Sequence, residues 1–254
     1  MNNIRILLIT ILIFHISDTS IYAGNEKSIV ISGTKEQPQL LATSTGELSI
    51  HLPQLAGVFR LGLISGEKSL WLSGMSNPIA EKSKEKLTFT FLNVLQTPSE
   101  IILKICSLPD TNGFIMELEC SGLPQDAQFC WAFGAGYGKE VEDKTKQMLL
   151  PEYCKDNVFN IEGNAFTLYY GEVMKLRIIN GIAPRESEIR LSDTYQINSP
   201  LSFYKSGKKT DAPSLCGLFP AKEKEKYYFC LYRRNREVDY NYFMLPELFS
   251  KIYK

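Results

Sequence analysis

Apolar and polar residues alternate with a period of two along much of the chain. In segments 86–95 and 114–120 apolar residues recur at every second position, and Glu117 and Glu119 alternate with those of the second segment. The side chains expected to share a buried face are Leu87, Phe89, Phe91, Phe114, Met116, Leu118 and Cys120. Because successive side chains of a strand point to opposite sides, this pattern predicts strands with one buried face.

Runs rich in β-branched and aromatic residues predict further strands. These runs are 47–52, 57–64, 69–72, 100–106, 128–133, 165–170, 173–179, 226–233 and 238–244. Segments 110–113 and 162–164, and the pair Asn180 and Gly181, are typical turn sequences. Helical periodicity is confined to short stretches at 139–150 and 246–253. The sequence therefore predicts a mainly β protein, a single large antiparallel β-sandwich with little helix.

The N-terminus has the pattern of a secretory signal. Arg5 supplies a positive charge, residues 6–16 form an apolar run, and Ala23 suits the cleavage position. The run is too short to span a bilayer comfortably, and an uncleaved anchor is the alternative. We therefore expect a signal peptide at 1–23 and a β-sandwich domain at 24–254, exported to the periplasm or the cell surface. No membrane insertion is expected after signal cleavage, because no later apolar run is long enough.

The charge balance argues against nucleic acid as a partner. The chain has 28 basic and 28 acidic residues, and its formal net charge is zero. Nucleic-acid binding normally requires a basic face, so no nucleic-acid partner is expected. The charged segment 222–226 is interpreted as a solvated hairpin tip.

The chain contains six cysteines, all of them after the predicted signal. They are Cys106, Cys120, Cys130, Cys154, Cys216 and Cys230. An exported chain can oxidise its cysteines, so they are expected to be buried small hydrophobic residues or members of one or two disulfides. Their spacing does not choose among the possible pairings. His51 is the only histidine after the signal, so neither a metal nor a cofactor is expected.

No catalytic constellation stands out. The glycine loop 134–139 lacks the first glycine and the final hydroxyl residue of a phosphate-binding loop. His51 alternates along a predicted strand and is expected to be a partly exposed strand residue rather than a catalytic base. The acidic residues are too numerous to single out the carboxylate pair of a glycosidase. No catalytic residue is therefore predicted.

Aromatic residues are the remaining resource, since their faces stack on the apolar faces of sugar rings. The chain has 13 Tyr, 14 Phe and 2 Trp. Trp71 and Trp131 lie in strand-like runs and are expected in the core. The candidate carbohydrate-binding residues lie in the predicted loop that follows Trp131, and they are Tyr137, Lys139, Glu152 and Tyr153.

One combination of motifs resembles a known family. The motifs are GLI at 62–64 with KSLWL at 68–72, WAFG at 131–134 with GK at 138–139, PEYCKDN at 151–157, GNAFTL at 163–168, and SEIRLSD at 187–193 with SP at 199–200. Over about residues 58–232 the chain resembles the Bacteroidetes domain of unknown function DUF4450. The resemblance implies the N-terminal β-sandwich of exported proteins whose C-terminal part is a six-hairpin, glycosidase-like barrel.

The resemblance suggests an exported, non-catalytic module of glycan degradation, which packs on a six-hairpin glycosidase domain or chain and contacts a glycan. One alternative is a glycoside hydrolase, or part of one, that acts with a separate barrel. Another is a periplasmic protein-interaction module. A last one is the remnant of a truncated gene, in which the apolar face of a helix at 244–253 lacks a partner.

Overall fold

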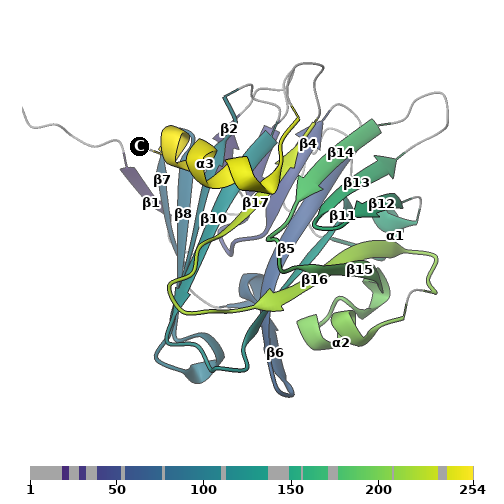
Figure 1. Cartoon of the computed structure of the whole chain (residues 1–254), viewed down its shortest axis with the longest axis horizontal. Coiled ribbons are helices and arrows are strands. Elements are labelled where there is room, and N and C mark those ends of the chain that lie inside the picture. Colours follow the sequence, from purple (N-terminus) through teal and green to yellow (C-terminus); the bar gives the residue numbers. More distant parts are fainter. Residues whose placement is uncertain are drawn as a thin grey trace, which may run out of the picture.

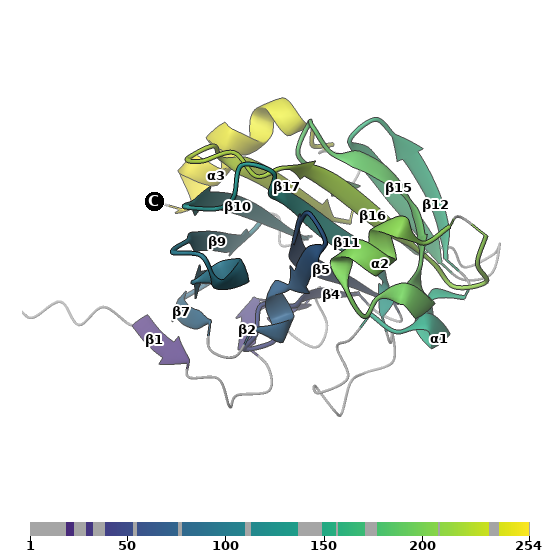
Figure 2. The same cartoon turned by 90° about the horizontal axis from the view of Figure 1, so that it is seen from below.

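Two antiparallel sheets pack face to face in the computed structural model, as Figure 1 and Figure 2 show. The structure describes residues 19–22, 29–32, 39–52, 55–75, 78–109, 113–136, 149–155, 157–170, 177–207, 209–233 and 239–253. The prediction of a mainly β sandwich is confirmed.

The first sheet, sheet A, has nine described strands. In spatial order they are β1 (Thr19–Tyr22), β7 (Ile79–Ser83), β8 (Lys86–Leu92), β9 (Glu100–Ser107), β10 (Gly113–Ser121), β17 (Tyr227–Tyr232), β14 (Arg177–Ile182), β13 (Ala165–Tyr170) and β12 (Val158–Glu162). The β9–β10 hairpin expected from the sequence is present, with Phe114 opposite Ser107.

The second sheet, sheet B, has eight described strands. In spatial order they are β15 (Glu188–Asp193), β16 (Pro213–Pro220), β11 (Gln128–Gly136), β5 (Leu55–Ser65), β4 (Leu48–Leu52), β3 (Gln39–Ala42) and β2 (Ile29–Ser32), and β6 (Lys68–Trp71) pairs with β5. Short 3₁₀ turns are η1 (Leu72–Gly74), η2 (Val94–Gln96), η4 (Thr194–Gln196) and η5 (Tyr242–Met244).

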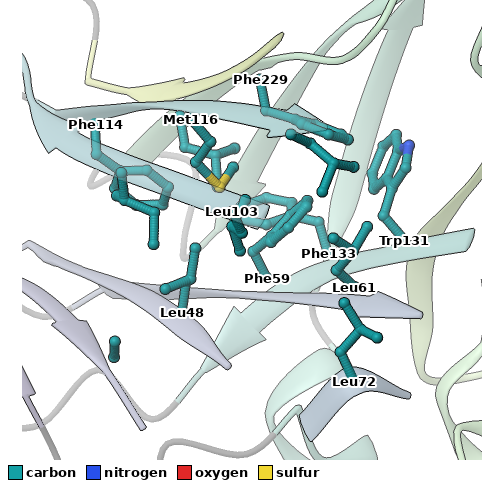
Figure 3. Close-up of a cluster of buried hydrophobic side chains, with 14 of the residues drawn as sticks. Leu48, Phe59, Leu61, Leu72, Leu103, Phe114, Met116, Trp131, Phe133 and Phe229 are labelled. Atoms are coloured by element: carbon teal, nitrogen blue, oxygen red, sulfur yellow. The ribbon is translucent and has the colours of Figure 1, made fainter. Parts of the chain in front are cut away.

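The main core lies between the inner faces of the two sheets. Figure 3 shows Phe59 and Trp131 from sheet B and Phe229 from sheet A pointing into one cluster. The Phe59 and Phe229 rings meet edge to face with centroids 5.1 Å apart, a favoured aromatic geometry. Both tryptophans are buried, as expected. The alternating side chains of β8 and β10 line this core.

The three helices of the described residues cover the outer faces of the sandwich. Helices α1 (Pro151–Cys154) and α2 (Pro200–Lys205) pack on sheet B, and α3 (Leu245–Tyr253) packs on β9, β10 and β17 of sheet A. Figure 2 shows α3 and α2 against different sheets. Each covered face forms a second apolar layer, centred on Cys130 and Phe203 in sheet B and on Cys230 and Phe249 in sheet A.

The turn expected at Asn180 and Gly181 is wrong. Both residues lie inside β14, where Gly181 is opposite Phe166 of β13. A Cβ atom on Gly181 would lie 2.0 Å from the Phe166 ring, so the glycine is required by close packing rather than by a turn. The expected turn at 162–164 is confirmed, and Gly163 has a φ of 63°. The predicted strand at 173–179 begins at Arg177 in the structure, and 173–176 lie outside the described residues.

The strand predicted at 238–244 is also wrong. Its last three residues form η5, which Asn241 caps by accepting a hydrogen bond from the Phe243 backbone N–H at 3.1 Å. Helix α3 follows, as the periodicity of 246–253 predicts. The apolar face of this helix does have a partner, because Leu245 and Phe249 are buried against sheet A. The observation that favoured a truncated remnant is therefore removed.

Candidate functional site

The four residues predicted to bind carbohydrate lie in the connection between β11 and β12. Tyr137 and Lys139 lie outside the described residues. Glu152 and Tyr153 are neighbours on α1, where Glu152 is exposed and Tyr153 is half-buried. The Cys154 thiol anchors α1 by donating to the Ala135 carbonyl at 3.6 Å, which holds the helix on the outer face of sheet B.

Glu47 is a buried acid on the outer side of sheet B. Its carboxylate accepts two hydrogen bonds from Arg60 Nη2, at 3.0 and 3.2 Å, and one from the Leu149 backbone N–H at 3.4 Å. Burial raises the pKa of Glu47, and the Arg60 charge opposes that shift. The carboxylate is fully engaged by its partners, so its arrangement is that of a structural ion pair rather than of a free acid or base.

Glu117 is a second buried acid, on the outer face of sheet A. It accepts hydrogen bonds from Lys104 Nζ at 3.0 Å, Lys226 Nζ at 3.1 Å and the Tyr228 hydroxyl at 2.9 Å. Burial alone would raise the pKa of Glu117, but these hydrogen bonds outweigh it and hold the pKa below its usual range. Lys226, expected at a solvated hairpin tip, is thus also part of an ion-pair network.

His51 lies on β4 and is half-buried, as expected of a strand residue. Its Nε2 atom is 3.0 Å from the Ser49 hydroxyl, and burial lowers its pKa to about 4. Ser49 is buried, whereas His51 keeps part of its surface exposed. Within the described part of the chain no group of three His, Cys, Asp or Glu side chains is placed to hold a metal ion.

One pocket of about 240 Å³ opens between the β10–β11 and β16–β17 connections. Its walls include Cys120, Leu123, Gln125 and Lys222, and of its described lining residues only Glu223 is acidic. Ligand pockets for small molecules are normally about 300–1,000 Å³. The pocket is too small and lacks the paired carboxylates that glycoside hydrolysis requires.

The outer face of β12, β13 and β14 carries an apolar row that α3 does not bury. Val158, Tyr169 and Ile178 are directly opposite one another across the three strands. Val158 is 61% exposed and Ile178 38% exposed, and Tyr169 between them is partly exposed. Directly opposed side chains have Cβ atoms about 5 Å apart, so the three form one continuous strip.

A polar row runs beside this strip, one step further along the same strands. Asn160, Thr167 and Asn180 are opposite one another, and Thr167 Oγ1 donates to Asn180 Oδ1 at 3.1 Å. The Nδ2 donor of Asn180 is buried and has no hydrogen-bond partner among the described residues. Asn160 Nδ2 donates to Glu162 Oε1 at 2.7 Å. The six residues of the two rows form what we call the sheet A platform: Val158, Tyr169, Ile178, Asn160, Thr167 and Asn180.

The platform is not among the sites that the sequence pattern predicts. The alternation in 165–170 places Tyr169 on the other face of the strand from the core residues Phe166 and Leu168. This alternation was the sequence signal for an outward-facing tyrosine. The partners of Tyr169 across the strands were hidden, because β14 was expected to end before Asn180. Strand register, which sets these neighbours, requires the fold.

A family model described as a domain of unknown function, DUF4450, matches residues 52–252. The chain belongs to the DUF4450 family. None of the curated proteins matches it.

The DUF4450 match extends further at both ends than the resemblance at 58–232. It takes in α3, which supports the view that this helix is part of the domain. It also includes every residue of the sheet A platform, whereas Glu47 precedes it. No described helix of this DUF4450 protein is long and apolar enough to cross a membrane.

Proposed function

We propose that this DUF4450 protein is an exported, non-catalytic module that binds a glycan and assists its degradation by a glycosidase barrel. The observation that carries the proposal is the sheet A platform. It combines an apolar strip, in which Tyr169 is the aromatic member, with amide and hydroxyl side chains. A sugar ring has the same two properties, an apolar C–H face and a rim of hydroxyl groups.

In the proposed contact the sugar lies across β12, β13 and β14. The apolar face of one ring packs on Tyr169 between Val158 and Ile178, and its hydroxyls bond to Asn160, which is exposed. A flat sheet face suits an extended polysaccharide chain better than a small molecule, which needs a concave pocket.

The non-catalytic part of the proposal is supported by the state of the buried acids. Glu47 and Glu117, the buried acids of the described residues, are each held by cationic partners in ion pairs. The association with a six-hairpin barrel is supported by family resemblance, and we propose that the barrel carries the catalytic acids.

The test is a screen of the chain against a glycan array, followed by titration of each hit. We expect Tyr169→Ala to weaken binding at least about tenfold, because it removes the stacking surface. Tyr195→Ala is the matched control, since Tyr195 is also exposed (48%) but lies on η4. Tyr153→Ala tests the site at α1 that the sequence suggests.

Each outcome of the screen is informative. Loss of binding in Tyr169→Ala with retention in Tyr195→Ala and Tyr153→Ala supports the platform. Loss only in Tyr153→Ala moves the site to α1. An array without any hit contradicts glycan binding.

A second candidate, a protein-interaction module, is favoured by one exposed side chain. Phe243 of η5 is 78% exposed, Met244 beside it is 39% exposed, and the Arg185 guanidinium lies 5.8 Å from the Phe243 ring. Exposed aromatic and arginine side chains are typical of binding hot spots. A pull-down with the glycosidase barrel that depends on Phe243, together with an empty glycan array, would favour this candidate.

A further inference from the structure

Two cysteines lie side by side beneath α2. Cys130 of β11 and Cys216 of β16 have their Sγ atoms 3.7 Å apart, and both residues are fully buried. The two strands are antiparallel neighbours, with Ala132 opposite Cys216 and Cys130 opposite Leu218. The two cysteines are therefore diagonal neighbours on the same face of sheet B.

We propose that Cys130 and Cys216 form a disulfide bond when the protein folds under oxidising conditions, such as those outside the cytoplasm. The two thiols lose two protons and two electrons, and the Cys130–Cys216 bond forms. The electrons pass to the disulfide of a thiol–disulfide oxidant, whose own S–S bond breaks to give two thiols. Exchange proceeds through a mixed disulfide, as in other thiol–disulfide reactions.

The geometry requires movement of side chains and backbone. A disulfide bond is about 2.05 Å long, so the sulfur atoms need to approach by about 1.7 Å. Diagonal neighbours on antiparallel strands have Cα atoms about 7–8 Å apart, at the upper limit for a disulfide, so rotation of the two side chains must be joined by a shift that draws the two paired strands together. The bridge would close a loop that contains β12 to β15 and both α1 and α2, because the cysteines are 86 positions apart. Cross-links over long loops restrict the unfolded chain strongly.

The disulfide bond forms while the protein folds rather than after folding is complete. In the folded protein Cys130 lies under the Pro200 carbonyl at the start of α2, 3.9 Å away, and no oxidant reaches it. Burial also raises the pKa of the Cys130 thiol well above its usual range, which suppresses the reactive thiolate. Oxidation therefore precedes the docking of α2.

The placement of the other cysteines excludes them from this bridge. Cys106 and Cys230 both lie opposite Ile115, on strands that flank β10, so they are two strand spacings or about 10 Å apart. Cysteines whose Cα atoms are more than about 7 Å apart cannot be bridged without backbone movement. Cys154 contacts Ala135, five residues and about 16 Å along β11 from Cys130. Cys120 faces the core between the sheets.

The deciding experiment is refolding of the reduced, denatured full chain in an oxidised glutathione buffer. Free thiols are then alkylated in denaturant, and peptides are mapped by mass spectrometry without reduction. We expect one linked pair of peptides, containing Cys130 and Cys216, and four alkylated cysteines. Six alkylated cysteines, or a different linked pair, would overturn the proposal.

A stability measurement provides the control. The bridged protein should melt at least about 5 °C higher than the same protein with reductant, as expected for a bridge over a long loop. Cys154→Ser should retain this difference, and the double variant Cys130→Ser, Cys216→Ser should lose it. Equal melting temperatures of the oxidised and reduced wild-type protein would contradict a native bridge. The outcome is independent of glycan binding, so it leaves the proposed function untouched.

Discussion

At the scale of single residues, buried ion pairs among the described residues contribute more to the free energy of unfolding than exposed ones. Arg60 and Glu47 form an ion pair in which both side chains are less than a tenth exposed, and Arg60 also lies 5.6 Å from the Trp71 ring. Lys205 and Glu67 form a pair on the surface, with both side chains largely exposed. Exposed pairs contribute little because water and salt screen them, whereas breaking a buried pair strands a charge.

Arg60→Ala should therefore destabilise the protein by about 3–5 kcal/mol, because Glu47 keeps its buried position without its cation. Lys205→Ala is the control and should change the free energy of unfolding by less than about 1 kcal/mol. Urea denaturation at neutral pH measures both. Equal effects of the two substitutions would show that the Glu47–Arg60 pair is not a buried structural element.

Glu117 should make stability depend on pH. Its folded-state pKa is lower than the unfolded value of 4.5, so its contribution is present above about pH 4.5 and is lost as pH falls through the folded pKa. Glu117→Gln should thus be less stable than wild type at pH 7, where Lys104 and Lys226 lose their anion. The difference in urea midpoint between the two proteins should shrink at acid pH. A difference that stays constant from pH 7 to below pH 4 would contradict this assignment.

At the scale of elements, close packing places residues where local propensity does not. Gly181 has strong turn propensity beside Asn180, yet it lies within β14, because the Phe166 ring occupies the space of a side chain. The strand predicted at 238–244 is a second case. Part of this segment forms η5 instead, and α3 follows it. Leu245 and Phe249 of α3 pack on an apolar surface of sheet A. A surface formed by distant strands is invisible to local sequence patterns.

Gly181→Ala should destabilise the protein by about 1–3 kcal/mol, the usual cost of overpacking a filled core. Gly207→Ala is the matched control, because a Cβ atom there meets no other atom within 4 Å and its φ is not positive. The control should change the free energy of unfolding by less than about 0.5 kcal/mol. Thermal and urea unfolding both report the difference. A Gly181→Ala protein with the stability of the Gly207→Ala protein would show that the Phe166 ring moves aside freely.

At the scale of the whole molecule, part of the predicted signal peptide pairs with the edge of the sandwich. Residues 19–22 belong to the predicted signal peptide, yet they form β1 at the edge of sheet A, with Tyr22 opposite Ala80 of β7. Cleavage after Ala23 would remove β1 from the chain. In the mature protein β7 (Ile79–Ser83) would then become the outermost strand beside β8.

We expect the exported protein to begin at Gly24 and its β7 amides to exchange hydrogen quickly. Strand β8 is the internal control, because β7 and β9 flank it and its amides should remain protected. Intact mass and hydrogen-exchange mass spectrometry measure the two properties on one sample. An exported chain that retains residues 19–22, with β7 as well protected as β8, would contradict cleavage at Ala23.

The sequence by itself determined the β-sandwich class, the inward faces of β8 and β10, the buried tryptophans and cysteines, and the short C-terminal helix. These features follow from local alternation and periodicity, which hydrophobic burial imposes on neighbouring residues. Only the tertiary structure decided that Gly181 is a strand residue, that α3 has a partner, and that Tyr169 stands between Val158 and Ile178. It also brought Cys130 to Cys216. The neighbours of Gly181 and Tyr169 and the meeting of the two cysteines depend on strand register, and the partner of α3 depends on packing against sheet A; local sequence patterns encode neither.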